Sequence, residues 1–459
     1  MPDGFFRFLR WTCAFGVFPA ILLICIPAYA ALSVEGAAAT ADYWTRTGND
    51  VFLITTEENE EHTQGLVTKG LVQDLPTASV SRSGFSVRSL IRQAAQGEDE
   101  ALPDLYDGAQ PLTPAVWQQV CDNRALARVG ARVTVQPAVA VRRADVRLLP
   151  TAAGWYESPN DVRYDVLQGT VLDPGEAVLV LHRSADTRFA FVETRDYYGW
   201  VDERAIADTD WRSWLGFAAP EEFFTVTATQ LQIEERGLLY QLGAKIPGVR
   251  AEDGTFHLLL PERDVGGHLT VREYHLPDDG GLTAGYLPAT RNNLIRLAFL
   301  PLHTAYGWGG ANEGMDCSSY VQNVYRAMGI SLPRDAHMQE RSCLLLPLAG
   351  LSAAERYALL ADVPPGALLF RPGHVMLYLG RDAGGRPLVI HDISSYYADG
   401  EKQYIRQVVV STLEFQNASG TAAIDTLDAI GFIAPAPWIW GHMPCGQSRT
   451  DMEGTNGTL

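Results

Sequence analysis

Cysteine is scarce in this chain, and neither a CxxC pair nor a Cys/His pattern with the spacing of metal ligands occurs. Structural zinc sites are usually built from such closely spaced residues, so the sequence predicts no metal site. Two of the six cysteines lie in the first 30 residues, and the other four are Cys121, Cys317, Cys343 and Cys445. If one of these four acts as a nucleophile and stays free, at most one disulfide can form among the other three, and its pairing is left open.

Clusters of positive charge are also absent. The chain has 36 Lys and Arg residues against 54 Asp and Glu residues, which gives a net charge of −18, and we find no stripe of basic residues. Proteins that bind nucleic acids need clustered Lys and Arg to displace counterions from the phosphates. We therefore expect no nucleic-acid partner.

The apolar run near the N-terminus, at 11–26, is shorter than the roughly 20 residues needed to span a bilayer. Two arginines precede it, and Ala-Tyr-Ala at 28–30 follows, which is the small-x-small pattern of a signal-peptidase site. This order predicts a signal peptide at 1–30 and a mature chain that begins at Ala31. Loss of two arginines and one aspartate would take the net charge from −18 to −19. No stable membrane span would remain after cleavage.

Two alternatives to a cleaved signal peptide stay open. One is an uncleaved membrane anchor. The other is lipidation at Cys25, because Leu22 to Cys25 is similar to a lipoprotein box, although the bulky Ile24 departs from the small residue of that pattern. All three interpretations indicate export, to the periplasm or outside the cell.

The length of 459 residues exceeds the roughly 100–200 residues of a single domain, so several domains are expected. Short β-rich runs broken by turns between about 133 and 206 predict a small barrel, and a second β-rich block follows from about 223 to 276. Residues 31–130 contain one plausible amphipathic helix, at 87–95, and no group of chemically active residues, so we interpret them as a docking segment. The clearest predicted strands are 139–141, 177–181, 189–192, 197–201, 256–261 and 269–271.

One cysteine lies in surroundings that favour chemistry. Asp316-Cys317-Ser318-Ser319 follows a glycine-rich turn at 306–310, and Gly329 would end the helix that begins here. Cys317 is expected in the first turn of that helix, where unpaired N–H groups and the positive end of the dipole stabilise a thiolate. An inert buried cysteine is the commoner case, but the polar, glycine-rich surroundings favour a nucleophile. The helical spacing is carried by Val321, Val324, Tyr325 and Met328.

Two of the ten histidines fall at matched positions of a predicted hairpin. His374 opens one strand after a glycine turn, and His391 lies in the next strand, with Gly384-Gly385 in the turn between them. An antiparallel hairpin that closes at this turn brings the two imidazoles close together, plausibly on one face. We interpret His374 as the base and His391 as the group that sets its tautomer and orientation. Surface or packing positions are expected for His62, His182, His257, His268, His275, His303, His337 and His442.

Four ordered motifs resemble those of the NlpC-type murein peptidases: Tyr306 to Gly310, Asp316 to Ser319, Gly373-His374-Val375, and His391. The resemblance is close over residues 290–440, and the family has a circularly rearranged papain-like fold. It implies an α+β chain, in which a papain-like NlpC-type catalytic domain is preceded by two small SH3-like β-barrels.

The predicted first barrel adds to this resemblance. GEAVLVL at 175–181 precedes YYGWV at 197–201, as in the SH3-like barrels of bacterial murein hydrolases. Plain core packing of Trp200 and Val201 is the alternative to a ligand groove. The expected segments are a signal peptide at 1–30, a docking or stabilising segment at 31–130, a first barrel at 131–208, a second barrel at 209–288, the peptidase domain at 289–440 and a flexible tail at 441–459.

The resemblance also implies a reaction. The relatives that it points to are γ-D-glutamyl-L-diamino-acid endopeptidases, which cleave the bond between γ-D-Glu and the L-diamino acid, meso-diaminopimelate, of murein peptides. Cys317 would form an acyl-enzyme, and His374 would protonate the leaving amine before it activates water. No metal or organic cofactor is implied.

Substrate contacts are implied by the same resemblance. In the motif Arg334-Asp335-Ala336, the carboxylate would bind the free amine of L-Ala, and alanine stands where relatives often have serine. The implied set is Tyr306 for the oxyanion beside the N–H of Cys317, Asp316 and Ser318 for D-Glu, Asp335 for the amine, and Glu157 and Tyr197 of the first barrel as residues that close the site.

Two other functions stay open. The chain could be a murein-binding protein without turnover, whose barrels bind the wall. It could also be an amidase or acyltransferase that uses the same thioester chemistry on a lipid or a glutamine side chain. The choice between intact wall and released peptides as substrate is likewise left open.

Overall fold

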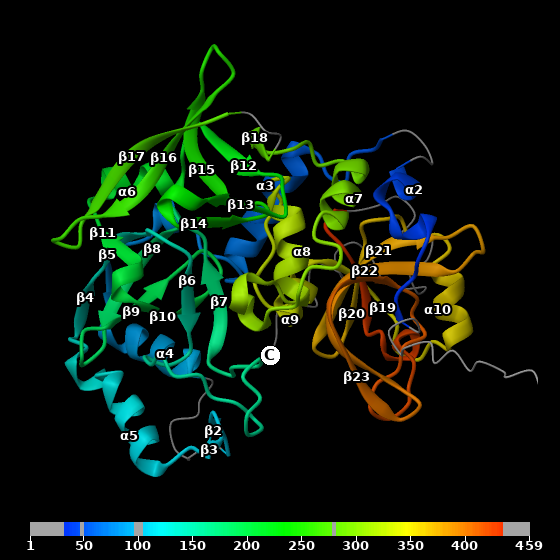
Figure 1. Cartoon of the computed structure of the whole chain (residues 1–459), viewed down its shortest axis with the longest axis horizontal. Helices are drawn as coiled ribbons and strands as arrows, with labels where there is room; N and C mark the ends of the chain where they lie inside the picture. Colours follow the sequence, from blue (N-terminus) through cyan, green and yellow to red (C-terminus); the bar gives the residue numbers. More distant parts are fainter. Residues whose placement is uncertain (1–31, 46–49, 96–103, 278–280, 435–459) are drawn as a thin grey trace, which may run out of the picture.

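The computed structural model of the chain describes residues 32–45, 50–95, 104–277 and 281–434 (Figure 1). The expected signal peptide, the expected tail and Cys445 lie outside these ranges. Figure 1 shows two halves on either side of helix α8 (Cys317–Arg326), with two of the three larger sheets in one half and the third in the other. Within the described ranges, no helix combines the length and the apolar composition that a bilayer crossing requires.

The first sheet has seven strands in the order β11-β5-β8-β9-β10-β6-β7, and it contains the short strands expected between 133 and 206. Trp200 and Val201 are fully buried, which favours core packing over a ligand groove. Helix α6 (Trp211–Ala218) follows the sheet and buries Trp214 in the same core. The strands are β5 (Gln136–Ala140), β6 (Ala144–Arg147), β7 (Gln168–Leu172), β8 (Ala177–Arg183), β9 (Phe189–Glu193), β10 (Tyr198–Asp202) and β11 (Ile206–Asp208), with η4 (Glu203–Ala205) before β11.

The second sheet has five strands in the order β17-β16-β15-β12-β18, and a separate hairpin, β13-β14, lies beside it. Its core contains the fully buried Tyr240 and Phe224. Strand β17 lies at the sheet's edge and pairs with β16 over eight residues. The elements are β12 (Phe223–Val226), β13 (Gln230–Ile233), η5 (Glu234–Arg236), β14 (Leu238–Gln241), β15 (Lys245–Arg250), β16 (Phe256–Arg263), β17 (Leu269–Leu276) and β18 (Leu282–Ala284).

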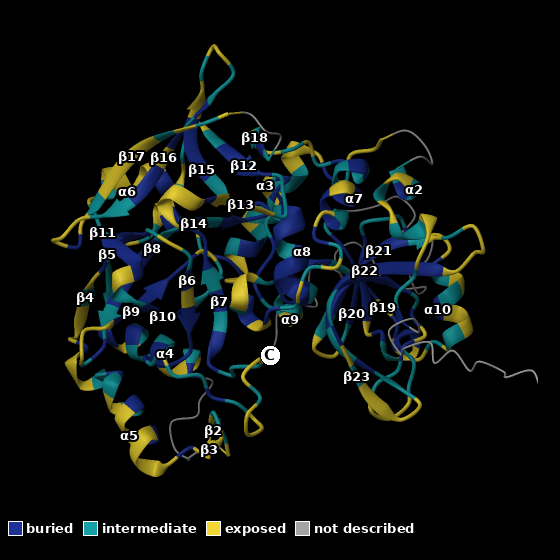
Figure 2. Ribbon diagram, viewed as in Figure 1, coloured by how far each residue is buried: buried dark blue, intermediate teal, exposed yellow. Residues whose placement is uncertain are grey.

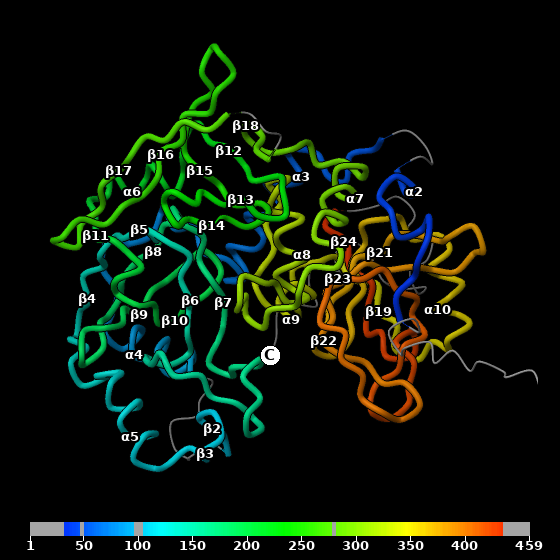
Figure 3. Tube along the Cα trace, in the orientation of Figure 1, coloured from blue at the N-terminus to red at the C-terminus, as the bar shows by residue number. Residues whose placement is uncertain are grey.

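The N-terminal region contacts both halves of the molecule, as the blue trace in Figure 3 shows. The side chain of Asn59 donates to the carbonyl oxygen of Gly329 at 3.1 Å in the peptidase half. Helix α4 buries Val87 and Ile91 against the first barrel's Trp200. The elements are η1 (Ala37–Ala39), α2 (Ala41–Thr45), α3 (Thr56–Thr68), η2 (Leu75–Thr77), β1 (Ser81–Ser83), α4 (Gly84–Ala94), β2 (Tyr106–Asp107), β3 (Gln110–Pro111), α5 (Pro114–Asn123), η3 (Leu126–Arg128) and β4 (Arg132–Thr134).

The third sheet is antiparallel, with six strands in the order β19-β24-β20-β21-β22-β23. One face packs on α8, where Val321 and Val324 contact a cluster that includes Val375. Figure 2 shows that α8 is buried along its length, between this sheet and the barrels. The elements are α7 (Arg291–Phe299), η6 (Trp308–Glu313), α8, α9 (Ala336–Ser342), β19 (Leu344–Pro347), α10 (Ala353–Leu359), β20 (Leu368–Arg371), β21 (His374–Arg381), β22 (Pro387–Ala398), β23 (Glu401–Ser411), η7 (Ala423–Thr426) and β24 (Ala429–Phe432).

Candidate active site

Cys317 is the first residue of α8, as the sequence predicts. A capping box starts the helix: an oxygen of the Asp316 side chain accepts from the N–H of Ser319 at 2.9 Å, and the Ser319 hydroxyl accepts from the N–H of Asp316 at 2.8 Å. The helix ends at Arg326, and Gly329 follows with a φ of +74°. The cap therefore fixes the position of the sulfur at the end of the helix that carries unpaired N–H groups.

Two opposing effects act on the thiol of Cys317. Burial and, next, the Asp316 carboxylate raise its pKa to about 12, although the backbone N–H of Val375 donates to the sulfur and opposes this shift. The stabilisation of a thiolate by the helix N-terminus stays a prediction, and burial works against it. The contact with Val375 places the sulfur beside the residue that follows His374.

Three side chains behind the sulfur form a hydrogen-bonded relay. Nε2 of His374 lies 2.7 Å from Nδ1 of His391, and Nε2 of His391 lies 3.0 Å from Oγ of Ser411. The expectation that the two imidazoles lie close together is thus confirmed. Strands β21 and β22 place Leu377 opposite Ile390, with a bulge between Tyr378 and Gly380.

One consistent direction of this relay assigns both histidine tautomers. With the hydroxyl of Ser411 donating to the carbonyl oxygen of Thr412 at 3.0 Å, its oxygen accepts the N–H from Nε2 of His391. Nδ1 of His391 is then unprotonated and accepts from Nε2 of His374. This leaves Nδ1 of His374 as the basic nitrogen.

Burial shifts both imidazoles toward the neutral form. It lowers the pKa of His374 to about 3, with a smaller contribution from Arg371, and burial together with His374 lowers the pKa of His391 well below its ordinary value. A neutral imidazole is the form that can accept a proton, as a general base must.

The glycine-rich turn before Cys317 is held against strand β7 of the first barrel. Gly309 has a φ of +59°, and a Cβ atom there would lie 2.7 Å from the carbonyl oxygen of Gln168. The Gln168 side chain donates to the oxygen of Gly309 at 3.2 Å, and the Arg143 guanidinium donates to the oxygen of Gly310 at 2.8 Å. Glycine is required here because the barrel approaches the backbone so closely.

Asp316 and Ser318 belong to a buried network around Arg334. The Arg334 guanidinium donates to both oxygens of Asp316, at 2.7 and 3.1 Å, and to the Ser318 hydroxyl at 2.9 Å. Its Nε donates to the hydroxyl of Thr170 in the barrel at 2.8 Å. Burial raises the pKa of Asp316, but Arg334 outweighs this and holds it below the usual range. The implied contacts of Asp316 and Ser318 with D-Glu stay a prediction, since protein donors already occupy these oxygens.

A barrel loop crosses the front of the site. The hydroxyl of Tyr164, between β6 and β7, lies 2.8 Å from Oγ of Ser394, and Nε of Arg406 donates to it at 3.1 Å. The Tyr164 ring lies 6.4 Å from the ring of Tyr306 and 6.3 Å from that of Trp308. Tyr306 is half-buried, and burial followed by the nearby Cys317 raises its pKa, so its hydroxyl stays protonated. Sequence reasoning missed Tyr164, because no local pattern signals a contact across 230 positions.

Asp335 is the N-cap residue of helix α9, but its side chain makes no capping hydrogen bond. The carboxylate is half-buried, and burial raises its pKa despite the adjacent Arg334. Its charge acts on Tyr197 of the first barrel, since after burial it contributes most to the raised pKa of that phenol. Glu157, the other barrel residue proposed from the sequence, is exposed.

Asp392 is a buried acid that sequence reasoning also missed. It is fully buried, and among the described residues neither of its carboxylate oxygens has a hydrogen-bond partner. Burial and then Asp316 raise its pKa well above the ordinary value. Its carboxylate also contributes to the raised pKa of Cys317 and to that of Tyr306. Asp392 directly follows His391 in strand β22. Successive side chains of a strand point to opposite faces, so a carboxylate on the other face of the sheet from His391 was the available signal.

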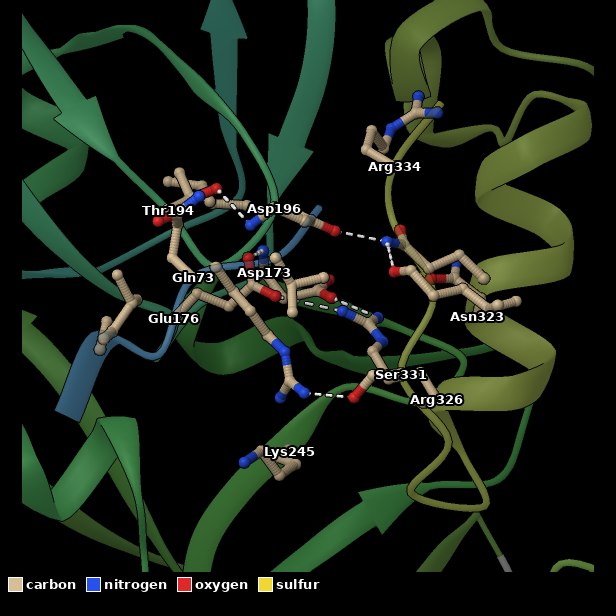
Figure 4. A pocket seen from close by; sticks show the side chains of 18 of the residues that line it. Gln73, Asp173, Glu176, Thr194, Asp196, Lys245, Asn323, Arg326, Ser331 and Arg334 are labelled. Carbon is tan, nitrogen blue, oxygen red and sulfur yellow. Dashed lines mark hydrogen bonds and ion pairs between the residues drawn. The ribbon is translucent and has the colours of Figure 1, made fainter. Parts of the chain in front are cut away.

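A cavity of about 450 Å³ lies between α8, α3 and the first barrel (Figure 4). Neither Cys317 nor the two relay histidines line it. Its central guanidinium, Arg326, is paired with Asp173 at 2.8 Å and with Glu176 at 3.1 Å. The cavity is therefore separate from the sulfur and belongs to the contact between the two halves.

Comparisons with known proteins agree with this architecture. Residues 303–422 match the NlpC/P60 family, and residues 155–202 match the SH3 domain of the SH3b1 type. A solved NlpC/P60 endopeptidase from Photobacterium damselae subsp. piscicida superposes with a TM-score of 0.72 over 88% of this chain and 98% of that one, at 16% identity. This likeness concerns the fold, and it confirms the expected α+β architecture.

Two curated relatives share part of the sequence. The Gamma-D-glutamyl-L-lysine dipeptidyl-peptidase of Bacillus subtilis (strain 168) is 26% identical over 220 residues, which cover 47% of this chain and 66% of that protein. Dipeptidyl-peptidase 6 of Lysinibacillus sphaericus is 34% identical over 94 residues, which cover 20% of this chain and 31% of that protein. The aligned part of the chain thus spans about a third of one relative and just under two thirds of the other.

Proposed function

We propose that this chain is an exported cysteine peptidase that hydrolyses murein peptides in the periplasm or outside the cell. The matches to an SH3 domain and, after it, to the NlpC/P60 family support this function. Cys317 is the nucleophile, His374 the base and His391 the orienting group. The observation that carries this proposal is the relay, which leaves one basic nitrogen on His374, next in sequence to the residue that touches the sulfur.

The proposed bond is that between γ-D-Glu and the L-diamino acid, meso-diaminopimelate. The thiol proton moves to Nδ1 of His374 while the sulfur attacks the γ-carbonyl carbon. The N–H of Cys317 and the phenol of Tyr306 donate to the oxyanion. His374 then gives the proton to the leaving amine, and a thioester remains. Water attacks the thioester as His374 accepts its proton, which releases the acid and restores the thiol.

A free L-Ala at the start of the peptide is the proposed specificity. The carboxylate of Asp335 is not used as a helix cap and acts electrostatically on the phenol of Tyr197, so it can pair with a terminal ammonium. The loop that carries Tyr164 is tied to two strands of the peptidase half and narrows the site. Both features favour small released peptides over stems still joined to the glycan.

The direct test uses L-Ala-γ-D-Glu-diaminopimelate and purified sacculi. Hydrolysis of the tripeptide supports the proposal, whereas binding to sacculi without turnover would favour a murein-binding protein. Mass spectrometry of the products separates peptide hydrolysis from an amidase or acyltransferase. Transfer of the acyl group to an amine instead of to water would contradict the proposal.

The roles of the two histidines can be separated by their variants. His374→Ala should lower kcat by about 10²–10⁴-fold, since the proton transfer itself is lost. His391→Ala should lower it less, because only the tautomer and the orientation of His374 are lost. Ser411→Ala, which removes the acceptor of the relay's last N–H, should be milder still. If His391→Ala is more damaging than His374→Ala at saturating substrate, the roles are reversed.

The loop residue Tyr164 should set the preference for small peptides. Tyr164→Phe removes two hydrogen bonds of about 1 kcal/mol each, so kcat/KM for the free tripeptide should fall by about tenfold or more. Tyr164→Ala should also narrow the ratio of kcat/KM between the tripeptide and a muramyl-linked peptide. Tyr156→Phe, in the same loop, is the matched control. An unchanged ratio in Tyr164→Ala would show that the loop does not govern access.

A further inference from the structure

Two histidines that the sequence places among surface residues meet on the second sheet. His257 of β16 lies directly opposite His275 of β17, and their rings are stacked with centroids 4.0 Å apart and planes 8° from parallel. Glu273 lies two residues before His275, and side chains two apart on a strand share a face. The three side chains therefore project together from the outer face of the β16-β17 hairpin.

The polar atoms of these three side chains converge on one point. Nδ1 of His257 lies 2.9 Å from Oε1 of Glu273, and Nε2 of His275 lies 3.2 Å from the same oxygen. The three ligand atoms lie within 4.8 Å of one another. Zinc bonds of about 2.0–2.1 Å in a tetrahedron put neighbouring ligand atoms about 3.3 Å apart. The two measured separations from the carboxylate oxygen are close to this tetrahedral edge.

We propose that His257, Glu273 and His275 form a binding site for a divalent transition-metal ion of the zinc class. Two imidazoles and one carboxylate are a ligand set that zinc accepts with three protein ligands and an open fourth position. The side chains are 29%, 55% and 61% exposed in the order His257, Glu273 and His275, so an ion can enter and water can complete the shell. This site is independent of the proposed peptidase function.

A second carboxylate lies near the site. Asp253, in the turn before β16, accepts hydrogen bonds from the N–H and the hydroxyl of Thr255 and interacts electrostatically with both imidazoles. A bound ion would join β17, at the edge of the sheet, to its neighbour β16. Metal binding should therefore stabilise the pairing of the edge strand β17 with β16.

Zinc titration by calorimetry tests the proposal on the full chain. The wild type should bind one more Zn²⁺ than His275→Ala, or that site should weaken at least about 100-fold, since even the loss of a residue that only supports a ligand costs 10–100-fold. Co²⁺ should give a visible absorption band that His257→Ala abolishes. Mg²⁺ and Ca²⁺ should not compete, because these ions prefer oxygen ligands.

The matched control is His268→Ala, since His268 is an exposed histidine just before β17 that lies outside the cluster. It should leave the zinc stoichiometry and affinity unchanged. Zinc that binds near Cys317 would be retained by every variant of the hairpin and would not be mistaken for this site. Absence of zinc binding to the wild type, or equal binding by wild type and His275→Ala within about twofold, would overturn the proposal. A thermal unfolding curve of His275→Ala, measured in parallel without zinc, reports that the chain is folded.

Discussion

Replacing Cys317 with alanine should abolish hydrolysis of L-Ala-γ-D-Glu-diaminopimelate, with a loss of at least about 10⁴-fold in kcat. The thioester cannot form without the sulfur, and neither His374 nor the oxyanion donors can replace a covalent step. The fold should persist, because the substitution removes one atom from a capped helix and costs about 1 kcal/mol. Single-turnover kinetics and a thermal unfolding curve measure the two effects separately.

Cys343→Ala is the matched control for this prediction. Cys343 is also a buried thiol whose pKa burial raises to about 12, yet it lies away from the relay, so its loss should leave turnover unchanged. A small alkylating agent should label Cys317 ahead of Cys121, Cys343 and Cys445, because the proposed base, His374, can accept the proton of its thiol. His374→Ala should remove that advantage. Preferential labelling of another cysteine would contradict the assignment.

Asp335→Asn should cripple cleavage of peptides that begin with a free L-Ala. Loss of one partner of a buried charge pair costs about 2–5 kcal/mol, which corresponds to about 30-fold to several thousand-fold in kcat/KM. N-acetylation of the peptide should reduce cleavage by the wild type by a similar factor. The two losses should not add, because each removes the same ion pair.

Glu340→Gln is the control for the loss of a charge on the same helix. Glu340 lies on α9, is half-buried and has a pKa raised by burial, yet it lies one turn beyond Asp335. The Glu340→Gln variant should keep the wild-type ratio of kcat/KM between the free and the acetylated peptide. Equal rates of the wild type on the two peptides would show that Asp335 is only a turn residue, and would favour action on intact wall.

The sequence predicts those features that depend on local patterns. The helix after Cys317 follows from its apolar spacing, and the barrel strands follow from short β-rich runs. The contact of the two imidazoles follows from the hairpin, although the register of Leu377 with Ile390 makes them diagonal neighbours rather than a directly opposed pair. Helix α3 escaped this reasoning because only Leu66 of its residues is buried, so it has no apolar stripe. Its signal was the capping box of Thr55 and Glu58, which the structure contains.

What the sequence could not predict depends on contacts between distant segments. Burial of the Cys317 thiol results from packing on all sides of α8, so its ionisation could not be inferred from the helix dipole. Tyr164 reaches the site only because the barrel is docked on it. Likewise His257 and His275 become neighbours only once the register of β16 and β17 is set, and a one-residue slip would separate them.

The hydrogen bonds between the first barrel and the peptidase half affect how the chain unfolds and whether its parts can be separated. Arg334 with Thr170, and Gln168 with Gly309, are internal hydrogen bonds that an excised peptidase domain would leave unsatisfied. The barrel is thus packed directly against the segment that carries Cys317 rather than held to it by a linker alone. The two parts should melt in one cooperative transition, and transplanting the peptidase domain alone should yield an insoluble or inactive fragment.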